Sequence, residues 1–232
     1  SLADITAGNW VFTPVAGANG TGYASFTFSD RDSNNTYDAA PNTLTVNVTA
    51  ANDAPTDLAL SANTVAENAA NGTSIGTVSG TDPDSGDTQS YSLTDTAGGR
   101  FAIDSSTGEI TVANGTLLNY EAAASHSVTV RVTDSGGLTY DETFTINLTN
   151  VNESPTGADA TVTINEDGSH TMTAANFGFS DVDAGDSLSA VRIDTLPGAG
   201  SLTLSGVAVT AGQVITVADI TAGNWVFTPV AG

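Results

Sequence analysis

Apolar and polar residues alternate in several short segments of the chain, and this alternation is the clearest structural signal in the sequence. It occurs in TLTVNVTA at 43–50, in VTVRVTD at 128–134 and in ETFTINLTN at 142–150. An alternation with a period of two places every second side chain on the same face of an extended strand. We therefore expect these segments to be half-buried antiparallel strands, each with one apolar face.

Clusters of glycine, asparagine and aspartate separate the apolar segments, as in GANGTG at 17–22, DPDSGD at 82–87, ANGT at 113–116 and DSGG at 134–137. Glycine accepts positive φ values, and Asn and Asp side chains bond to nearby backbone groups, so such clusters favour turns. Short strands and turns at this spacing are typical of β-sandwiches. High acidity can indicate disorder, but an apolar content of 39% in regular alternation favours a folded, all-β chain.

One segment of the sequence occurs twice without a single difference. ADITAGNWVFTPVAG occupies residues 3–17 and again residues 218–232. An exact repeat of this length indicates a tandem array. We interpret the chain as one period of that array with a short overlap.

The end of a strand is followed twice by an asparagine, an acidic residue and then proline. The first case leads through Asn52 and Asp53 to Pro55, and the second through Asn152 and Glu153 to Pro155. Proline stiffens the chain and ends regular pairing, as at the exit from a domain into a linker. The predicted division is therefore the second half of a module at 1–53, a complete module at 54–153, and the first half of the next module at 154–232.

Five motifs follow one another along the middle module. They are VAEN at 65–68, TDPDSGD at 81–87, GRFAIDSSTGEITV at 99–112, LNYE at 118–121 and VTVRVTDSGG at 128–137. In this order and at this spacing, the module resembles a cadherin repeat over its whole length. The resemblance implies Ig-like, cadherin-like antiparallel β-sandwich modules arranged in tandem.

The split module has its own motifs, two of which come from the preceding period. In module order they are INEDG at 164–168, SDVDAGDSL at 180–188, GQVITVADITAGNWVFTP at 212–229, GYASFTFSDRDSN at 22–34 and NTLTVNVTAANDAP at 42–55. They resemble the bacterial cadherin-like repeats of giant secreted adhesins of the RTX or type I secreted kind. This resemblance implies an extracellular protein at the cell surface.

The charge of the chain limits its partners. The formal net charge is −22, with 26 acidic residues and only four basic ones. Such a chain repels nucleic acids and anionic membranes, whereas divalent cations are its natural counter-charge. No apolar run approaches the roughly 20 residues that a membrane-spanning helix needs, so membrane insertion is not expected.

The side chains that most enzymes use for nucleophilic or metal-assisted catalysis are scarce. The chain has no cysteine and two histidines, His126 and His170, neither of which lies in a recognisable catalytic motif. The DSGG segment at 134–137 is similar to a serine-protease loop, but a triad also requires a histidine base and an orienting acid. We interpret the segment as a turn after a strand and expect no enzymatic activity.

More than half of the acidic residues fall in the turns and linkers at the ends of the predicted modules. Calcium requires six to eight oxygen ligands, which one short loop rarely supplies. Loops from two adjoining modules and their linker can supply them. The alternative is that these turns simply cap strands and stay solvated.

The cadherin resemblance implies calcium ions at two junctions. At the first, linker residues would share ions with the module below and with the preceding half-module. At the second, acids of the middle module would share ions with the next linker and module. The candidate ligands are Asn52, Asp53, Asp82, Asp84, Asp87 and Asp134, with Glu166 and Asp167 as equivalents from the preceding half-module, and then Glu67, Glu121, Asn152, Glu153, Asp181, Asp183 and Asp186, with Asp30 and Asp32 from the missing half of the next module.

The linkers contain fewer acids than those of animal cadherins, and Asn119 and Tyr120 replace the Asp-Arg pair that precedes the family's glutamate. We therefore expect fewer ions than the roughly three per junction that the resemblance implies.

The predicted function is a calcium-rigidified extender repeat of a long extracellular adhesin or surface fibre that serves cell adhesion or biofilm formation. Its partners would be neighbouring repeats of the array or neighbouring copies that bind head to tail, each completing the half-modules. One alternative is a filament subunit that exchanges half-modules. Another is a module that binds glycans or proteins through aromatic side chains; Trp10 and Trp225, one array position seen twice, are interpreted instead as core residues.

Overall fold

The computed structural model describes residue 5 and residues 7–231. The chain divides into two compact units, Ser1–Leu118 with Ser125–Asn147, and Asn119–Ala124 with Leu148–Gly232. Most of the described structure is antiparallel strand, with only short helical turns. The predicted module limits at 53 and 153 each lie inside one of these units and stay a prediction.

The first part of unit 1 is a two-stranded antiparallel sheet of β1 (Gly20–Phe28) and β2 (Asn42–Val48). Phe26 lies opposite Leu44 in this pair, and Ala24 lies opposite Val46. Directly opposite residues share a face, so these four side chains form one apolar face. Serines and threonines occupy the other face, as the alternation in the sequence predicts.

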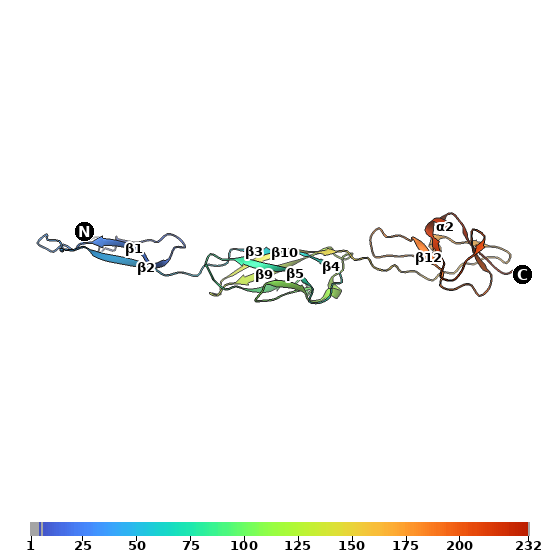
Figure 1. Ribbon diagram of the computed structural model, residues 1–232, viewed down its shortest axis with the longest axis horizontal. Helices are drawn as coiled ribbons and strands as arrows, with labels where there is room; N and C mark the ends of the chain where they lie inside the picture. Colours follow the sequence, from blue (N-terminus) through green and yellow to red (C-terminus); the bar gives the residue numbers. More distant parts are fainter. Residues whose placement is uncertain (1–4, 6, 232) are drawn as a thin grey trace. The chain divides into compact units, whose positions relative to one another are not determined.

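The rest of unit 1 is a sandwich of two four-stranded sheets, seen in cyan to yellow in Figure 1. One sheet has the order β4-β10-β9-β6 and the other has the order β3-β5-β8-β7. The strands are β3 (Asp57–Leu60), β4 (Thr64–Ala66), β5 (Ser74–Thr81), β6 (Ser90–Asp95), β7 (Phe101–Ile103), β8 (Glu109–Val112), β9 (Ser125–Thr133) and β10 (Thr139–Thr149).

The core of the sandwich comes from the alternating residues of both sheets. Val128, Val130 and Val132 of β9 are completely buried, and they pack in one core with Phe101 and Ile110 of the other sheet. β9 pairs with β10 on one side and with β6 on the other. The predicted all-β antiparallel sandwich is therefore confirmed.

Unit 2 contains shorter strands around a second core. The sheets have the orders β11-β16-β13-β14 and β12-β15. The elements are β11 (His170–Thr171), η2 (Ala174–Phe177), β12 (Ala190–Arg192), β13 (Ser201–Leu204), β14 (Val207–Ala208), β15 (Val214–Thr216), α2 (Val217–Thr221) and β16 (Trp225–Thr228).

Trp225 lies in this second core and is 2% exposed. Its ring stacks on Phe177, with ring centroids 5.2 Å apart and an interplanar angle of 3°. Ile193, Ile215 and Ile220 belong to the same buried cluster. The burial of Trp225 supports its interpretation as a core residue, whereas Trp10 is 70% exposed and lies in no core of the described structure.

Candidate metal sites

Three carboxylates meet at one end of the sandwich. Asp82 and Asp87 lie in the loop after β5, and Asp134 follows β9. Each offers an oxygen atom, and these three atoms all lie within 4.8 Å of one another. The loop is closed by the backbone N–H of Asp84, which donates to Asp82 Oδ1 at 2.8 Å, and by the N–H of Asp87, which donates to the carbonyl of Asp84 at 3.2 Å.

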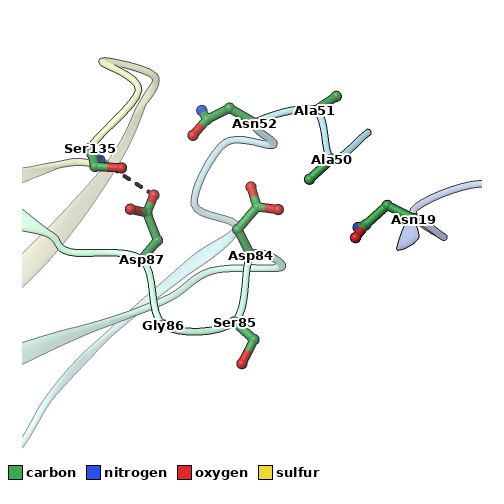
Figure 2. A pocket seen from close by; sticks show the side chains of 9 residues that line it. All are labelled: Asn19, Ala50, Ala51, Asn52, Asp84, Ser85, Gly86, Asp87 and Ser135. Carbon is green, nitrogen blue, oxygen red and sulfur yellow. Dashed lines mark hydrogen bonds between the residues drawn. The ribbon is translucent and has the colours of Figure 1, made fainter. Parts of the chain in front are cut away.

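The linker before the sandwich is hydrogen-bonded to the same group of acids. The Asn52 side-chain amide donates to Asp134 Oδ2 at 2.8 Å, and the backbone N–H of Asp53 donates to Asp84 Oδ2 at 2.7 Å. A Cβ atom at Gly136 would collide with the Asn52 side chain, so a larger residue there would displace that side chain from its contact with Asp134. Figure 2 shows Asn52, Asp84 and Asp87 around the pocket that lies between linker and loop.

The electrostatics of this group favour a bound cation. The pKa of Asp87 lies below its ordinary value because the side chain and backbone of Ser135 and the backbone N–H of Thr88 donate hydrogen bonds to it, and these outweigh its desolvation. Asp87 is therefore ionised at neutral pH. Asp82 Oδ2 is buried and has no hydrogen-bond partner within the described part of the chain. A buried carboxylate oxygen without a partner is costly, and a cation would remove that cost.

A second group of carboxylates, in unit 2, has the same local geometry. Asp181, Asp183 and Asp186 each offer an oxygen atom, again all within 4.8 Å of one another. The N–H of Asp183 donates to Asp181 Oδ1 at 3.0 Å, and the N–H of Asp186 donates to the carbonyl of Asp183 at 3.2 Å. These contacts repeat those of Asp82, Asp84 and Asp87.

The linker before this second group is bound in a related way. The backbone N–H of Glu153 donates to Asp183 Oδ2 at 2.8 Å, as that of Asp53 does to Asp84. The side-chain amide of Asn150 donates to Asp183 Oδ1 at 2.8 Å. The amide of Asn152, the candidate that the sequence predicts, donates to the carbonyl of Glu153 at 2.7 Å. The available signal for Asn150 was its place directly after β10.

The remaining candidate glutamates lie at other points of the two units. Glu67 follows β4 in unit 1 and is 2% exposed. In unit 2, carboxylate oxygens of Glu121 and Glu153 lie within 4.8 Å of each other. A buried glutamate is rare unless it is paired or bound to a metal. Their role as ligands stays a prediction.

Besides Asp53 and Asp84, four candidate acids belong to no group of three metal-binding side chains in residues 5 and 7–231. Asp32 Oδ1 accepts from the backbone N–H groups of Asn34 and Thr36, both at 2.8 Å, so this carboxylate closes the turn after β1. Asp30 lies between β1 and this turn, and its carbonyl accepts from the N–H of Asp38 at 3.0 Å. Glu166 and Asp167 are exposed in a turn before β11.

The donor sets decide which metal fits. Both groups of three contain only carboxylates, with amide and backbone oxygens nearby, and neither contains a histidine. Oxygen donors suit calcium or magnesium, whereas zinc prefers nitrogen and sulfur ligands. The residues present therefore fit a hard divalent cation.

The two histidines take part in packing and turn structure. His126 lies in β9 against Phe101, with ring centroids 6.3 Å apart. Burial, and then the nearby Arg100, lower the pKa of His126, so its ring is neutral at neutral pH. His170 Nε2 is 3.1 Å from Asn176 Oδ1. Neither histidine has the nucleophile and orienting acid of a triad beside it in the described part of the chain.

Comparisons with known proteins agree on the fold. A family profile described as "Cadherin domain" matches residues 62–149. The structure of mouse cadherin-23 EC22-24 is 23% identical and has a TM-score of 0.56, covering 89% of this chain and 64% of its own. The protocadherin gammaB7 EC3-6 cis-dimer structure is 23% identical with a TM-score of 0.51, covering 83% of this chain and 49% of its own. No protein of curated function matches the chain.

The chain therefore spans from about half to two thirds of the length of these solved structures. At this level of identity the likeness shows the fold. Cadherin domains are extracellular, non-enzymatic adhesion modules that form tandem arrays and generally bind calcium. In residues 5 and 7–231, no helix has the length and apolar character needed to cross a membrane. The cadherin-domain profile therefore matches residues 62–149, and the chain has a cadherin-like β-sandwich fold.

Proposed function

We propose that the chain is a calcium-rigidified extender repeat of a long extracellular adhesin, of the bacterial giant-adhesin kind that its split module resembles. The observation that carries the proposal is the repeated linker contact. In both linkers the backbone N–H of an acidic residue, Asp53 or Glu153, donates to the second aspartate of an Asp-x-Asp loop. A calcium ion at that loop would fix the direction in which the linker leaves the module.

The proposed role of calcium is to stiffen the linkers between modules. Calcium neutralises carboxylates that otherwise repel each other, and so stabilises a linker geometry that the free chain reaches only against repulsion. With each linker fixed, consecutive modules keep one orientation, and the array holds a distal adhesive segment away from the cell.

The direct test is thermal unfolding of the 232-residue chain in calcium, in magnesium and in EDTA. A ligand that binds only the folded form stabilises it by about 2.7 kcal/mol at a hundredfold excess over Kd. For a domain of about 100 residues this corresponds to a rise in Tm of roughly 10 °C. We expect the rise with calcium and a much smaller one with magnesium, which dehydrates reluctantly and demands octahedral geometry. An equal Tm in calcium and EDTA would mean that the acidic loops are solvated turns.

The variant Asp82→Asn makes the test specific to the site. Its amide oxygen can still accept from the N–H of Asp84, whereas the carboxylate oxygen that lacks a partner is replaced by an amide nitrogen. We expect Asp82→Asn to keep or raise the Tm in EDTA and to reduce the rise caused by calcium. Asp159→Asn removes the same charge from an exposed position outside the acidic groups, so it should leave the calcium effect unchanged.

A further inference from the structure

The sheet of β1 and β2 has an apolar face that no other described element covers. Phe26 and Leu44, which lie opposite each other, are 46% and 48% exposed. Together with Trp10, Phe12 and Val46 they line a groove on this face. Large side chains in a folded β-sheet are normally buried on one face.

The middle sandwich contains the same hairpin in its completed form. In β9 and β10 the turn at Asp134 has its N–H bonded to the carbonyl of Leu138 at 3.0 Å, with a return bond from the Leu138 N–H to Asp134 Oδ1 at 2.8 Å. In β1 and β2 the turn at Asp32 makes the same two bonds with Thr36, at 2.9 and 2.8 Å. β1 and β2 are therefore the counterparts of β9 and β10.

The surroundings of β9 and β10 show which contacts β1 and β2 do not make in the described structure. On the side away from β10, β9 pairs with β6, the strand that follows the Asp82–Asp84 loop. The apolar face of β9 is completely buried. In unit 2 the strand that follows the corresponding Asp181–Asp183 loop is β12. Within the described residues β12 pairs only with β15, and β1 pairs only with β2.

The exact repeat in the sequence indicates which segment can cover the apolar face of β1 and β2. Trp225 is 2% exposed and stacked on Phe177, whereas Trp10, in the identical segment, is 70% exposed. The same tryptophan is thus buried in the second occurrence of the repeated segment and exposed in the first. The residues that cover Trp225 precede it in the chain, so the 154–232 region of a second copy offers β1 and β2 the same kind of cover.

We propose that β1 of one copy of this chain pairs antiparallel with the free edge of β12 in a second copy. In that arrangement the apolar face of β1 and β2 packs beside β12 and β15 of the second copy, whose Ile215 and Trp225 are already buried. The Trp225 of that copy then takes the place of Trp10. An added strand gains affinity from backbone hydrogen bonds and specificity from alternate side chains. The contact joins different surfaces of the two copies, so it propagates head to tail. This interface goes beyond the calcium function and does not depend on it.

The free edge of β12 can be blocked selectively. The bonds that flank β12, from Ile193 N to Gln213 O and from Val217 N to Ser189 O, point toward β15. In an antiparallel pair the direction of these groups alternates, so the N–H of Arg192 faces the free edge. Arg192→Pro removes this donor. Arg192→Ala keeps it, while losing the same exposed ion pair with Asp194.

The other side of the interface is tested with Leu44→Asp, and Leu117→Asp is the matched control. Leu44 is 48% exposed and Leu117 is 38% exposed, so neither change removes a fully buried side chain. Both add one negative charge. Only Leu44 lies on the proposed interface.

The experiment is sedimentation velocity of the full chain from about 1 µM to about 1 mM, the range of weak specific association. It is run in EDTA with salt and again in calcium. We expect concentration-dependent head-to-tail oligomers of the unmodified chain in both buffers, since screening offsets the repulsion between two acidic halves. Leu44→Asp and Arg192→Pro should weaken association at least tenfold, whereas Leu117→Asp and Arg192→Ala should not. We expect these effects on association whether or not the chain binds calcium, so they test the interface separately from the calcium proposal.

Mixing the two blocked chains keeps the proposal falsifiable even if one variant is partly misfolded. Leu44→Asp retains an intact β12 edge, and Arg192→Pro retains an intact β1 face. Their mixture should form a 1:1 dimer and nothing larger. A strictly monomeric unmodified chain, oligomers that ignore both variants, or a mixture that stays monomeric would each overturn the proposal.

Discussion

At the scale of single residues, the two tryptophans offer a comparison in which the surrounding sequence is held constant. Trp225 is buried against Phe177, and Trp10 is largely exposed. Replacing a buried tryptophan by alanine costs about 3–5 kcal/mol. We expect Trp225→Ala to raise amide hydrogen exchange throughout β13 and β16, and Trp10→Ala to leave it unchanged. Equal effects of the two variants, measured by mass spectrometry, would contradict the buried position of Trp225.

The acidic groups show which ligands sequence reasoning can find. The resemblance to the cadherin pattern is enough to name the acids of both Asp-x-Asp loops as candidate ligands, because each loop is a short local motif. It did not single out Asn150 or Ser135, whose contacts with Asp183 and Asp87 depend on the path of another segment. Glu166, Asp167, Asp30 and Asp32 lie in the predicted half-modules, and we expect them to join a metal site only where a complementary half lies beside them.

At the scale of elements, the hairpin of β7 and β8 depends on one glycine. Gly108 has a φ of +72°, and a Cβ atom there would collide with the carbonyl oxygen of Val78. Gly72 also has a positive φ, of +86°, but a Cβ atom there would meet open space. We expect Gly108→Ala to lower the free energy of unfolding by at least about 2 kcal/mol, and Gly72→Ala to lower it by only about 1 kcal/mol, the cost of the conformation alone.

Urea unfolding followed by circular dichroism measures this difference. The two variants share the same loss of backbone freedom in the unfolded state, so the comparison isolates the collision. Similar stabilities for Gly108→Ala and Gly72→Ala would mean that the hairpin can move away from Val78.

The strands that the sequence predicts well are those with strict alternation. The segments at 43–50, 128–134 and 142–150 correspond to β2, β9 and β10. The strands of unit 2 are harder to predict from the sequence because they are two to four residues long, too short to show a clear alternation of apolar and polar residues. Its one-turn helix α2 begins at a Thr216 cap that accepts from the N–H of Asp219, a local signal without an amphipathic pattern. Pairing between distant strands, such as β6 with β9, follows from topology, which alternation alone does not specify.

At the scale of the whole molecule, the net charge of −22 predicts how stability depends on salt. Carboxylates crowded at both Asp-x-Asp loops repel one another in the folded chain and separate on unfolding. Raising NaCl shortens the Debye length from about 30 Å at 0.01 M to about 10 Å at 0.1 M, so the Tm in EDTA should rise steadily with NaCl. At matched ionic strength, calcium chloride should raise the Tm further than magnesium chloride does, because the two cations screen equally and only site binding separates them. If NaCl at the same ionic strength reproduced the whole calcium effect, the cation would act by screening and not by occupying the two groups of carboxylates.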